Sequence, residues 1–355
     1  MQVSQVKRFA AMVRRRIGRS GVLLGVSLIA WYVWVVVAGT TSQYALELTS
    51  PYIVSPSALL FGIVAGGLLR GRWRHGKVMQ LLGVVLIVTA ISLPIYANAS
   101  AAVGGLFIAL IGLGVLDLQE AMQLNQPVGR DRRNSATDDS ALLQAIVLAL
   151  TLGAAILLVL DSQAALALTV PVALISVVAV WRHSGPPQWI VVLVGSLIAA
   201  GAVLAVVFLG SRASWPAWLA ASESLSSARH TLWSDALSLW ATAPVSGSGP
   251  GSFTPSSELA SSIPSLAAVH SLPLQVGSEL GAVGIVLLAV LFVGGLVFAA
   301  RGSRPIALIA VAAWTALAVH SSIDHLEDFP VVAFMAGVIL GWSELGAQAH
   351  RRRAA

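Results

Sequence analysis

Long apolar runs separated by short polar turns make up most of the chain. Ten of these runs approach or exceed the ~18 apolar residues that predict a membrane-spanning helix. They lie at about 21–39, 56–70, 78–96, 100–118, 140–160, 164–181, 188–210, 273–299, 305–321 and 330–346. We therefore predict an all-α polytopic membrane protein with about ten transmembrane helices, in which residues 1–355 form a single integral membrane domain.

Composition agrees with this pattern. The chain is 57% hydrophobic and 10% charged, whereas a soluble protein carries about 25% charged residues. No cysteine is present, which excludes a disulfide framework and a cysteine-ligated metal.

The basic residues predict how the chain is oriented. With the N-terminus in the cytoplasm, 19 of the 21 Lys and Arg residues fall in or at the ends of cytoplasmic segments. Because positive charge favours the cytoplasmic side, we expect both termini to lie in the cytoplasm. The first span follows KRFAAMVRRRIGRS and is longer than the core of a cleaved signal peptide, which favours an uncleaved anchor. The cytoplasmic segments are 1–20, 71–77, 119–139, 182–187, 300–304 and 347–355.

One long extracytoplasmic loop, residues 211–269, is predicted between the seventh and eighth spans. Within it, SLSSARHTLWSDALSLWATAP places Leu232, Trp233 and Ala236 at helical spacing. This pattern predicts an amphipathic helix that ends at Pro244 and lies on the membrane or on the tops of the spans. The stretch that follows, PVSGSGPGSFTPSS, predicts turns.

The two basic residues outside the cytoplasmic segments are Arg212 and Arg229. Arg229 shares the apolar face of the loop helix, and a buried guanidinium needs an anionic partner. That partner is either an acid of the same loop (Glu223, Asp235 or Glu258) or a phosphate or carboxylate of a substrate. Arg212 is either an interfacial anchor or a second anion-binding residue.

Two polar residues mark the eighth span, HSLPLQVGSELGAVG. On a regular helix, His270 lies on the same face as Gly277 and Gly281, which would let a neighbouring helix approach closely. His270 therefore points into the bundle, where an imidazole either satisfies a helix end or exchanges a proton. Glu279 lies about 13 Å deeper on such a helix, and it either binds substrate or locks the helix to a neighbour.

A third polar cluster, VHSSIDHLEDFP, forms the predicted outside turn between the last two spans. His320 and Asp324 are four residues apart and would stack on a continuing helix, as part of a proton relay or of a cleft wall. A compact three-ligand pattern is missing, so we expect no metal. Gly249 and Gly251 lack the context of a nucleotide fingerprint, and they either form a tight turn or offer backbone N–H groups to an anion.

In this order, the motifs resemble the O-antigen ligase and Wzy-type polymerase superfamily of bacterial membrane glycosyltransferases. Arg229 and Trp233 in ARHTLWSDAL fit R-x3-W, and PVSGSGPGSF fits P-x-x-G-x-G-x-G-x-F. HSLPLQVGSELGAVG fits H-[NS]-x-x-L-x4-E-x-G-x-x-G, and His320 with Asp324 fits a late H-x3-D. The resemblance covers about residues 212–345.

The resemblance implies a metal-independent, inverting glycosyltransferase. A glycan would move from undecaprenyl diphosphate, or a similar polyprenyl-diphosphate carrier, to an acceptor hydroxyl at the outer face of the plasma (inner) membrane. His270 would orient or deprotonate the acceptor, and Arg229 would stabilise the leaving diphosphate. No cofactor and no nucleic-acid partner are expected. The expected substrate-binding residues are Arg212, Gly249, Gly251, Glu279, His320 and Asp324.

Other functions stay open at the level of sequence. A ligase and a polymerase differ in their acceptor, and no residue distinguishes them. A transporter or flippase of lipid-linked oligosaccharide would favour charged residues inside several spans and detectable repeats, whereas Glu279 is the one secure buried acid. A non-catalytic scaffold would leave Arg229 and His270 without a role.

Overall fold

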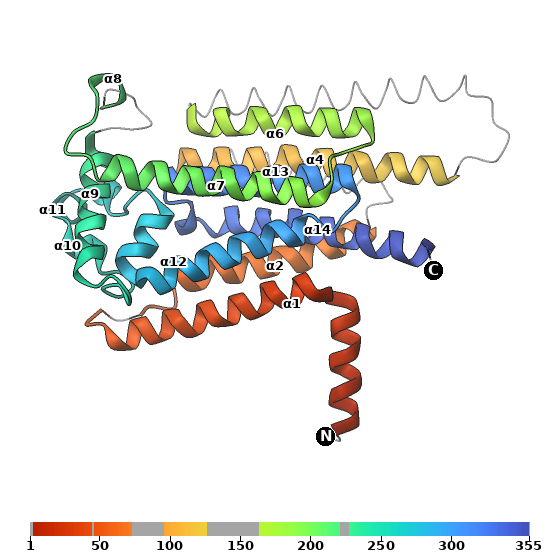
Figure 1. The fold of residues 1–355 in the computed structure, drawn as a ribbon, viewed down its shortest axis with the longest axis horizontal. Coiled ribbons are helices and arrows are strands. Elements are labelled where there is room, and N and C mark those ends of the chain that lie inside the picture. Colours follow the sequence, from red (N-terminus) through yellow and green to blue (C-terminus); the bar gives the residue numbers. More distant parts are fainter. Residues whose placement is uncertain (1–2, 45, 73–95, 126–162, 221–226, 355) are drawn as a thin grey trace.

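The computed structural model describes residues 3–44, 46–72, 96–125, 163–220 and 227–354, and over these ranges the chain is helical with no strand (Figure 1). Eight long helices form a bundle along the long axis of the molecule, and the N-terminal part of the first one bends away from it (Figure 1). They are α1 (Val3–Thr41), α2 (Pro51–Arg72), α4 (Ala97–Asn125), α6 (Gln163–Arg182), α7 (Gln188–Gly210), α12 (Leu272–Ala299), α13 (Arg304–Ile323) and α14 (Pro330–Ala354).

Six of the described helices are long and apolar enough to cross a membrane, which confirms the prediction of a polytopic membrane protein. These six belong to α1, α2, α4, α7, α12 and α13. The predicted spans at 164–181 and 330–346 coincide with shorter apolar helices in α6 and α14. The predicted spans at 78–96 and 140–160 lie outside the described residues, apart from residue 96, so the total of ten stays a prediction.

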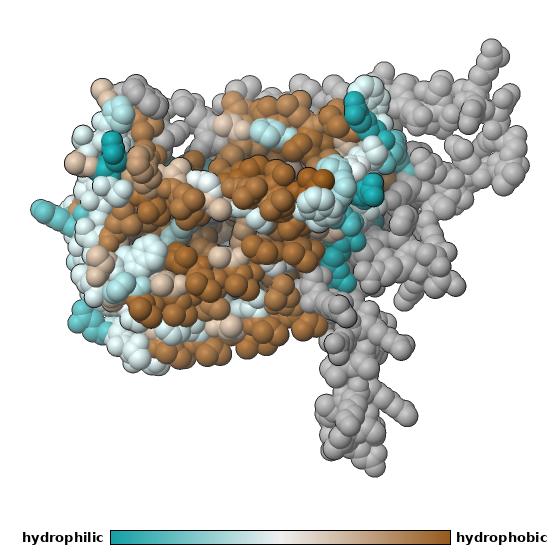
Figure 2. All heavy atoms as spheres, in the orientation of Figure 1, coloured by the Kyte–Doolittle hydropathy of each residue, from teal (hydrophilic) through white to brown (hydrophobic). Residues whose placement is uncertain are grey.

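The surface follows the same division. Apolar residues cover the middle of the face shown in Figure 2, and hydrophilic residues gather toward the two ends of the bundle. One end carries the short helices α9 (Ser227–Thr242), α10 (Phe253–Ser256) and α11 (Glu258–Ser262), and the C-terminus lies at the other end (Figure 1). An apolar belt between two polar ends is the surface that a bilayer requires.

Helices α2 and α14 pack with their backbones in close contact, which glycines on both helices make possible. A Cβ atom on Gly66 would lie 2.1 Å from the carbonyl oxygen of Val338, and one on Gly337 would lie 2.2 Å from that of Leu59. Small residues four apart let two backbones meet in this way in a membrane. The guanidinium of Arg70 joins the two helices at one end of the seam by donating to the carbonyl oxygen of Trp342 over 2.6 Å.

Helix α12 is broken at Gly281, which corrects the expectation of a regular helix through this segment. Gly281 has φ 67° and ψ −166°, a backbone conformation that is essentially limited to glycine. The break frees backbone groups, and the loop after α9 satisfies them. The N–H of Ala282 donates to Pro244, while the N–H groups of Ser248 and Gly249 donate to Ser278 and Glu279. The two glycine-containing motifs of the sequence are therefore one interlocked structure.

Candidate active site

His270 lies directly before α12, at the end of the bundle that carries α9. Its side chain is buried, and its φ of 54° is in the left-handed region that non-glycine residues rarely adopt. The indole N–H of Trp233 in α9 donates to the backbone carbonyl oxygen of His270 over 3.3 Å. The loop helix therefore helps to hold the histidine in an otherwise unfavourable conformation.

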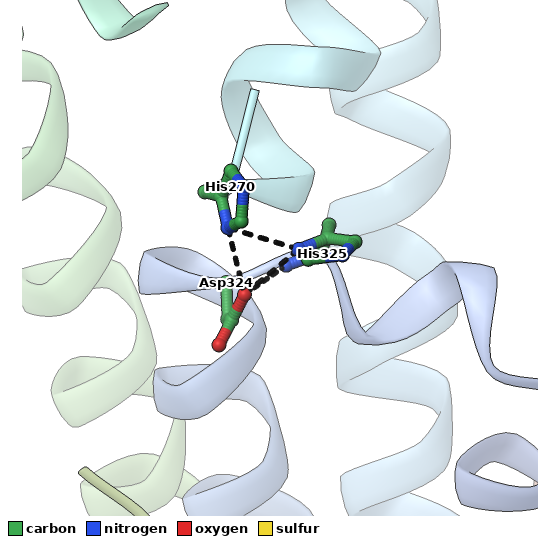
Figure 3. A group of neighbouring side chains, drawn as sticks. All are labelled: His270, Asp324 and His325. Carbon is green, nitrogen blue, oxygen red and sulfur yellow. Dashed lines mark hydrogen bonds and ion pairs between the residues drawn. The ribbon is translucent and has the colours of Figure 1, made fainter. Parts of the chain in front are cut away.

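Asp324 is the centre of the polar cluster. Helix α13 ends at Ile323, and Asp324 follows in an extended conformation with a side chain that is 1% exposed. Its Oδ1 atom lies 3.1 Å from Nδ1 of His270 and 2.9 Å from Nδ1 of His325 (Figure 3). The Tyr96 hydroxyl and the Asn98 amide also donate to this carboxylate, so one buried carboxylate organises four side chains.

Arg229 reaches the same carboxylate from α9. The arginine is buried together with Leu232 and Trp233, as the helical spacing predicted. Its Nη1 group donates to the carbonyl oxygen of Ile323 over 2.7 Å, and its Nη2 atom lies 3.7 Å from Oδ2 of Asp324.

The acid beside Arg229 is one that the sequence analysis did not consider for it. Of the acids proposed from the loop, Glu223 lies outside the described residues, and Asp235 accepts a hydrogen bond from the Ser257 hydroxyl. The contact between Arg229 and Asp324 joins segments that are almost a hundred residues apart, so spacing along the chain gave no signal for it.

The local charges set the protonation states of the cluster. Burial by itself raises the pKa of Asp324, but hydrogen bonds with His270 and His325 and the charge of Arg229 hold that pKa well below its usual range. Burial lowers the pKa of His270 by more than the Asp324 hydrogen bond raises it. Burial and the Asp324 charge raise the pKa of Tyr96 to about 12. At neutral pH the cluster therefore holds an ionised Asp324, a neutral His270 and a protonated Tyr96.

Tyr96, Asn98 and His325 are residues that the sequence analysis did not identify. Tyr96 and Asn98 stand at the start of α4, outside the motifs, and no pattern points to them. His325 is the residue after Asp324, so the quoted turn VHSSIDHLEDFP contained the signal. His325 joins the cluster because it lies next to His270, with 4.2 Å between the ring centroids. His270 itself has a left-handed backbone, which a sequence pattern does not predict.

Glu279 is fully engaged by hydrogen bonds, two from the segment after α9 and two from helices α2 and α12. Its carboxylate accepts the backbone N–H groups of Gly251 and Phe253 at 2.9 and 3.1 Å. The Tyr52 hydroxyl and the Gln275 amide donate to it over 2.8 and 2.9 Å. These four bonds give Glu279 the locking role that was one of its two interpretations.

The glycines of this loop adopt left-handed backbone conformations. Gly249 has φ 100° and Gly251 has φ 79°. The N–H of Gly249 donates to the carbonyl oxygen of Glu279, and that of Gly251 donates to the Glu279 carboxylate. The loop thus forms tight turns, and the acceptor for the Gly251 amide is a carboxylate of the protein itself.

Two predicted site residues lie apart from the cluster. His320 does not stack on Asp324, because α13 ends between them; it lines a cavity of about 30 Å³ together with Gly105 and Thr169. Arg212 is exposed, and its guanidinium carbon lies 5.2 Å from the centre of the Phe208 ring. The described structure brings together His270, Arg229 and Asp324, but it does not bring His320 or Arg212 into hydrogen-bond contact with them.

A large apolar cavity of about 510 Å³ lies beside the cluster. Helices α1, α2, α7, α12, α13 and α14 line it, and its polar wall includes Tyr52, Ser322 and Glu327. Leu204 and Val293 line the cavity and are also exposed on the outside of the bundle, so the cavity reaches the flank of the protein that faces lipid.

These features define a multi-pass helical membrane protein with a buried polar site at one end of its bundle. Residues 146–289 match the family model described as O-antigen ligase, and this match confirms the resemblance to the O-antigen ligase and Wzy-type polymerase superfamily. The matched range contains Arg229, His270 and Glu279 and ends before Asp324. No curated protein matches the chain. The match to this family model indicates a glycosyl-transferring enzyme of a bacterial membrane.

Proposed function

We propose that the protein transfers a glycan from a polyprenyl-diphosphate carrier to an acceptor hydroxyl at the outer face of the plasma membrane, with inversion at the anomeric carbon. The observation that carries this proposal is the meeting of His270 and Arg229 on the two oxygen atoms of Asp324. A base and a cation at one site are what alcohol attack and diphosphate departure require.

His270 acts as the base in this proposal. Its Nδ1 atom faces Asp324, while its Nε2 atom is buried with no hydrogen-bond partner among the described residues. With the proton on Nδ1, the Nε2 lone pair is directed to accept the proton of an acceptor hydroxyl. Asp324 then orients the ring and stabilises the imidazolium that forms, as a carboxylate does in a catalytic triad.

Arg229 stabilises the leaving group. Negative charge develops on the phosphate oxygens as the bond to the anomeric carbon breaks, and a guanidinium binds two such oxygens in one plane. Arg229 is held by Ile323 and Asp324 before substrate arrives, so it does not have to be reorganised. Arg212, at the same end of the molecule, is proposed as a second contact for the diphosphate or the acceptor.

The 510 Å³ cavity supports a donor with a lipid carrier, because apolar walls suit a prenyl chain and the polar end lies beside the cluster. The proposed orientation places α9 outside and both termini in the cytoplasm. Gly249, Gly251 and Glu279 shape the wall of the site, and His320 helps to position α13 against α4 and α6. No step of the proposed reaction uses a metal.

A transfer assay tests the function. Membranes carrying the protein are supplied with lipid-linked glycan donor and with two acceptor classes, a second lipid-linked glycan and a different surface glycolipid. His270→Ala should block product while donor binding survives, and Arg229→Ala should block product with the protein still inserted. His183→Ala and Arg304→Ala, which change exposed residues outside the cluster, are the matched controls. Donor that crosses the membrane without any product would instead favour the transporter.

A further inference from the structure

Three ligand atoms of the cluster form a nearly equilateral triangle. Nδ1 of His270, Nδ1 of His325 and Oδ1 of Asp324 are separated by 3.1, 3.0 and 2.9 Å. Figure 3 shows the three side chains converging from two different segments of the chain. All three side chains are buried or nearly so, with exposures of 5%, 13% and 1%.

Protons on these atoms cannot satisfy all three edges of the triangle. A neutral imidazole carries at most one proton on Nδ1, and an ionised carboxylate carries none. Two protons can therefore serve two edges, and the third edge is left with two lone pairs or two hydrogens facing each other. A single cation above the face of the triangle, at bonding distance from all three atoms, would remove this conflict, because each atom could then offer a lone pair to it.

The dimensions suit a transition-metal ion. Zinc binds imidazole nitrogen at ~2.0–2.1 Å and carboxylate oxygen at ~2.0–2.2 Å. At such bond lengths, the observed sides correspond to angles of about 90–95° at the ion, as in the facial arrangement of two histidines and one carboxylate. The backbone N–H of His325 also donates to Oδ1 of Asp324 over 2.9 Å and fixes that oxygen as an acceptor.

The surrounding charges permit a cation here. Arg229 opposes it from the far side of the carboxylate, 3.7 Å from Oδ2. Asp328 is within electrostatic reach of both rings: the charges of His325 and His270 lower its pKa, although burial raises that pKa by more. Tyr96 and Asn98 orient the carboxylate from behind, which is the support that metal-ligating groups usually have.

We propose that His270, Asp324 and His325 form a binding site for a divalent transition-metal ion of the zinc class. The ion inhibits the enzyme reversibly, because it occupies Nδ1 of His270 and removes the carboxylate that orients the base. The inhibition rests on the proposed function, whereas the binding does not. The sequence could not indicate this site, because His270 lies 54 residues before Asp324.

Cobalt spectroscopy tests the site without any measurement of activity. The chain contains no cysteine, so visible d–d bands report nitrogen and oxygen ligands alone. Chelator-treated protein, purified without a polyhistidine tag and held in lipid nanodiscs, is titrated with Co²⁺, and the bands are then displaced by Zn²⁺. One equivalent per chain is expected. His325→Ala should weaken binding by more than about tenfold.

Controls separate ligation from folding. His230→Ala removes a loop histidine outside the triangle and should leave the titration unchanged. His325→Gln keeps the size of the residue, and thermal unfolding of both His325 variants shows that they are folded. If folded His325→Ala binds Co²⁺ as tightly as the unchanged protein, the site is refuted.

The transfer assay tests the inhibition. Equimolar Zn²⁺ should abolish product formation, and excess chelator should restore it. In His325→Ala, Zn²⁺ should inhibit less, so the amount of product formed with Zn²⁺ should approach the amount formed without it. Binding with no loss of transfer would overturn the inhibition and leave the site in place. If no donor and acceptor give product at all, the proposed function fails, and the cobalt bands still decide the site.

Discussion

Trp233 donates its indole N–H to the backbone carbonyl oxygen of His270, while Arg229, one helical turn earlier, contacts Asp324. Helix α9 therefore positions both the proposed base and the proposed cation. The R-x3-W spacing gains a physical reason from this arrangement, because residues four apart share one helix face. Helix α9 is therefore part of the candidate active site, because it supplies Arg229 and holds the backbone of His270.

Trp233→Phe should lower the turnover rate by about tenfold and change the KM for donor little. The substitution keeps an aromatic ring but removes the N–H that holds the left-handed His270, at a cost of about 1 kcal/mol in folding free energy. The smaller phenyl ring also leaves a cavity at this fully buried position. Trp240→Phe is the matched control, because its N–H donates to Pro244 at a similar distance of 3.0 Å. Equal rates for the two variants would show that the bond to His270 has no role in positioning.

Glu279→Gln separates the locking role from substrate binding. Each carboxylate oxygen accepts two hydrogen bonds, and an amide would turn an NH₂ group toward two donors. The free energy of unfolding should fall by about 1–3 kcal/mol, with faster proteolysis of the loop after α9. A rise in KM for donor at unchanged thermal stability would favour direct substrate contact instead.

Gly281→Ala should prevent normal folding of the first part of α12, which contains the break. A Cβ atom there would lie 2.3 Å from the carbonyl oxygen of Val245, and the backbone conformation is itself costly by more than about 1 kcal/mol for alanine. Gly201→Ala is the control, because no atom lies within 4 Å of its Cβ position. Thermal unfolding in detergent should show a lower midpoint for the first variant and an equal or higher one for the second. A normal midpoint for Gly281→Ala would mean that α12 can continue as a regular helix.

Transfer should depend on pH through His270. Burial lowers the pKa of His270 below 6.5, so the neutral base dominates at pH 7 and is lost as the pH falls through that lowered pKa. The kcat/KM of chelator-treated enzyme should be flat near neutrality and fall with a midpoint below pH 6.5. The free energy of unfolding falls over the same range, because the unfolded chain binds more protons.

Asp324→Asn supplies the second half of the pH test. The Asp324 carboxylate raises the pKa of His270 against the effect of burial. Its removal should therefore shift the kcat/KM midpoint to a still lower pH and reduce the plateau, because the imidazolium loses its stabilising charge. A midpoint at or above pH 6.5 in the unchanged enzyme would argue against His270 as the base.

The helices of the bundle could be predicted from sequence, because the bilayer requires long apolar helices however they pack against one another. Eight predicted spans coincide with described helices for that reason. The break at Gly281 was not accessible, since backbone groups supplied by residues 244–249 stabilise it. An apolar sequence with a glycine is compatible with either a straight or a broken helix until its partner is known.

Only part of the candidate site could be predicted from the sequence. Periodicity placed Arg229 on the buried face of α9, and the motif order singled out His270. The contact of Asp324 with Arg229 and the approach of His325 to His270 both depend on where α13 ends. One residue more of helix would have turned these side chains in other directions, and helix ends are the least defined feature of a hydropathy pattern.

The glycine seam between α2 and α14 has a consequence for biosynthesis. Arg70 and Trp342 are 272 residues apart in sequence, so the ribosome has released α2 into the bilayer long before its partner is made. During that interval a groove of bare backbone faces lipid or a temporary neighbour. Insertion of α14 is therefore the event that completes this helix pair, and truncations that remove α14 should expose the protein to degradation by membrane proteases.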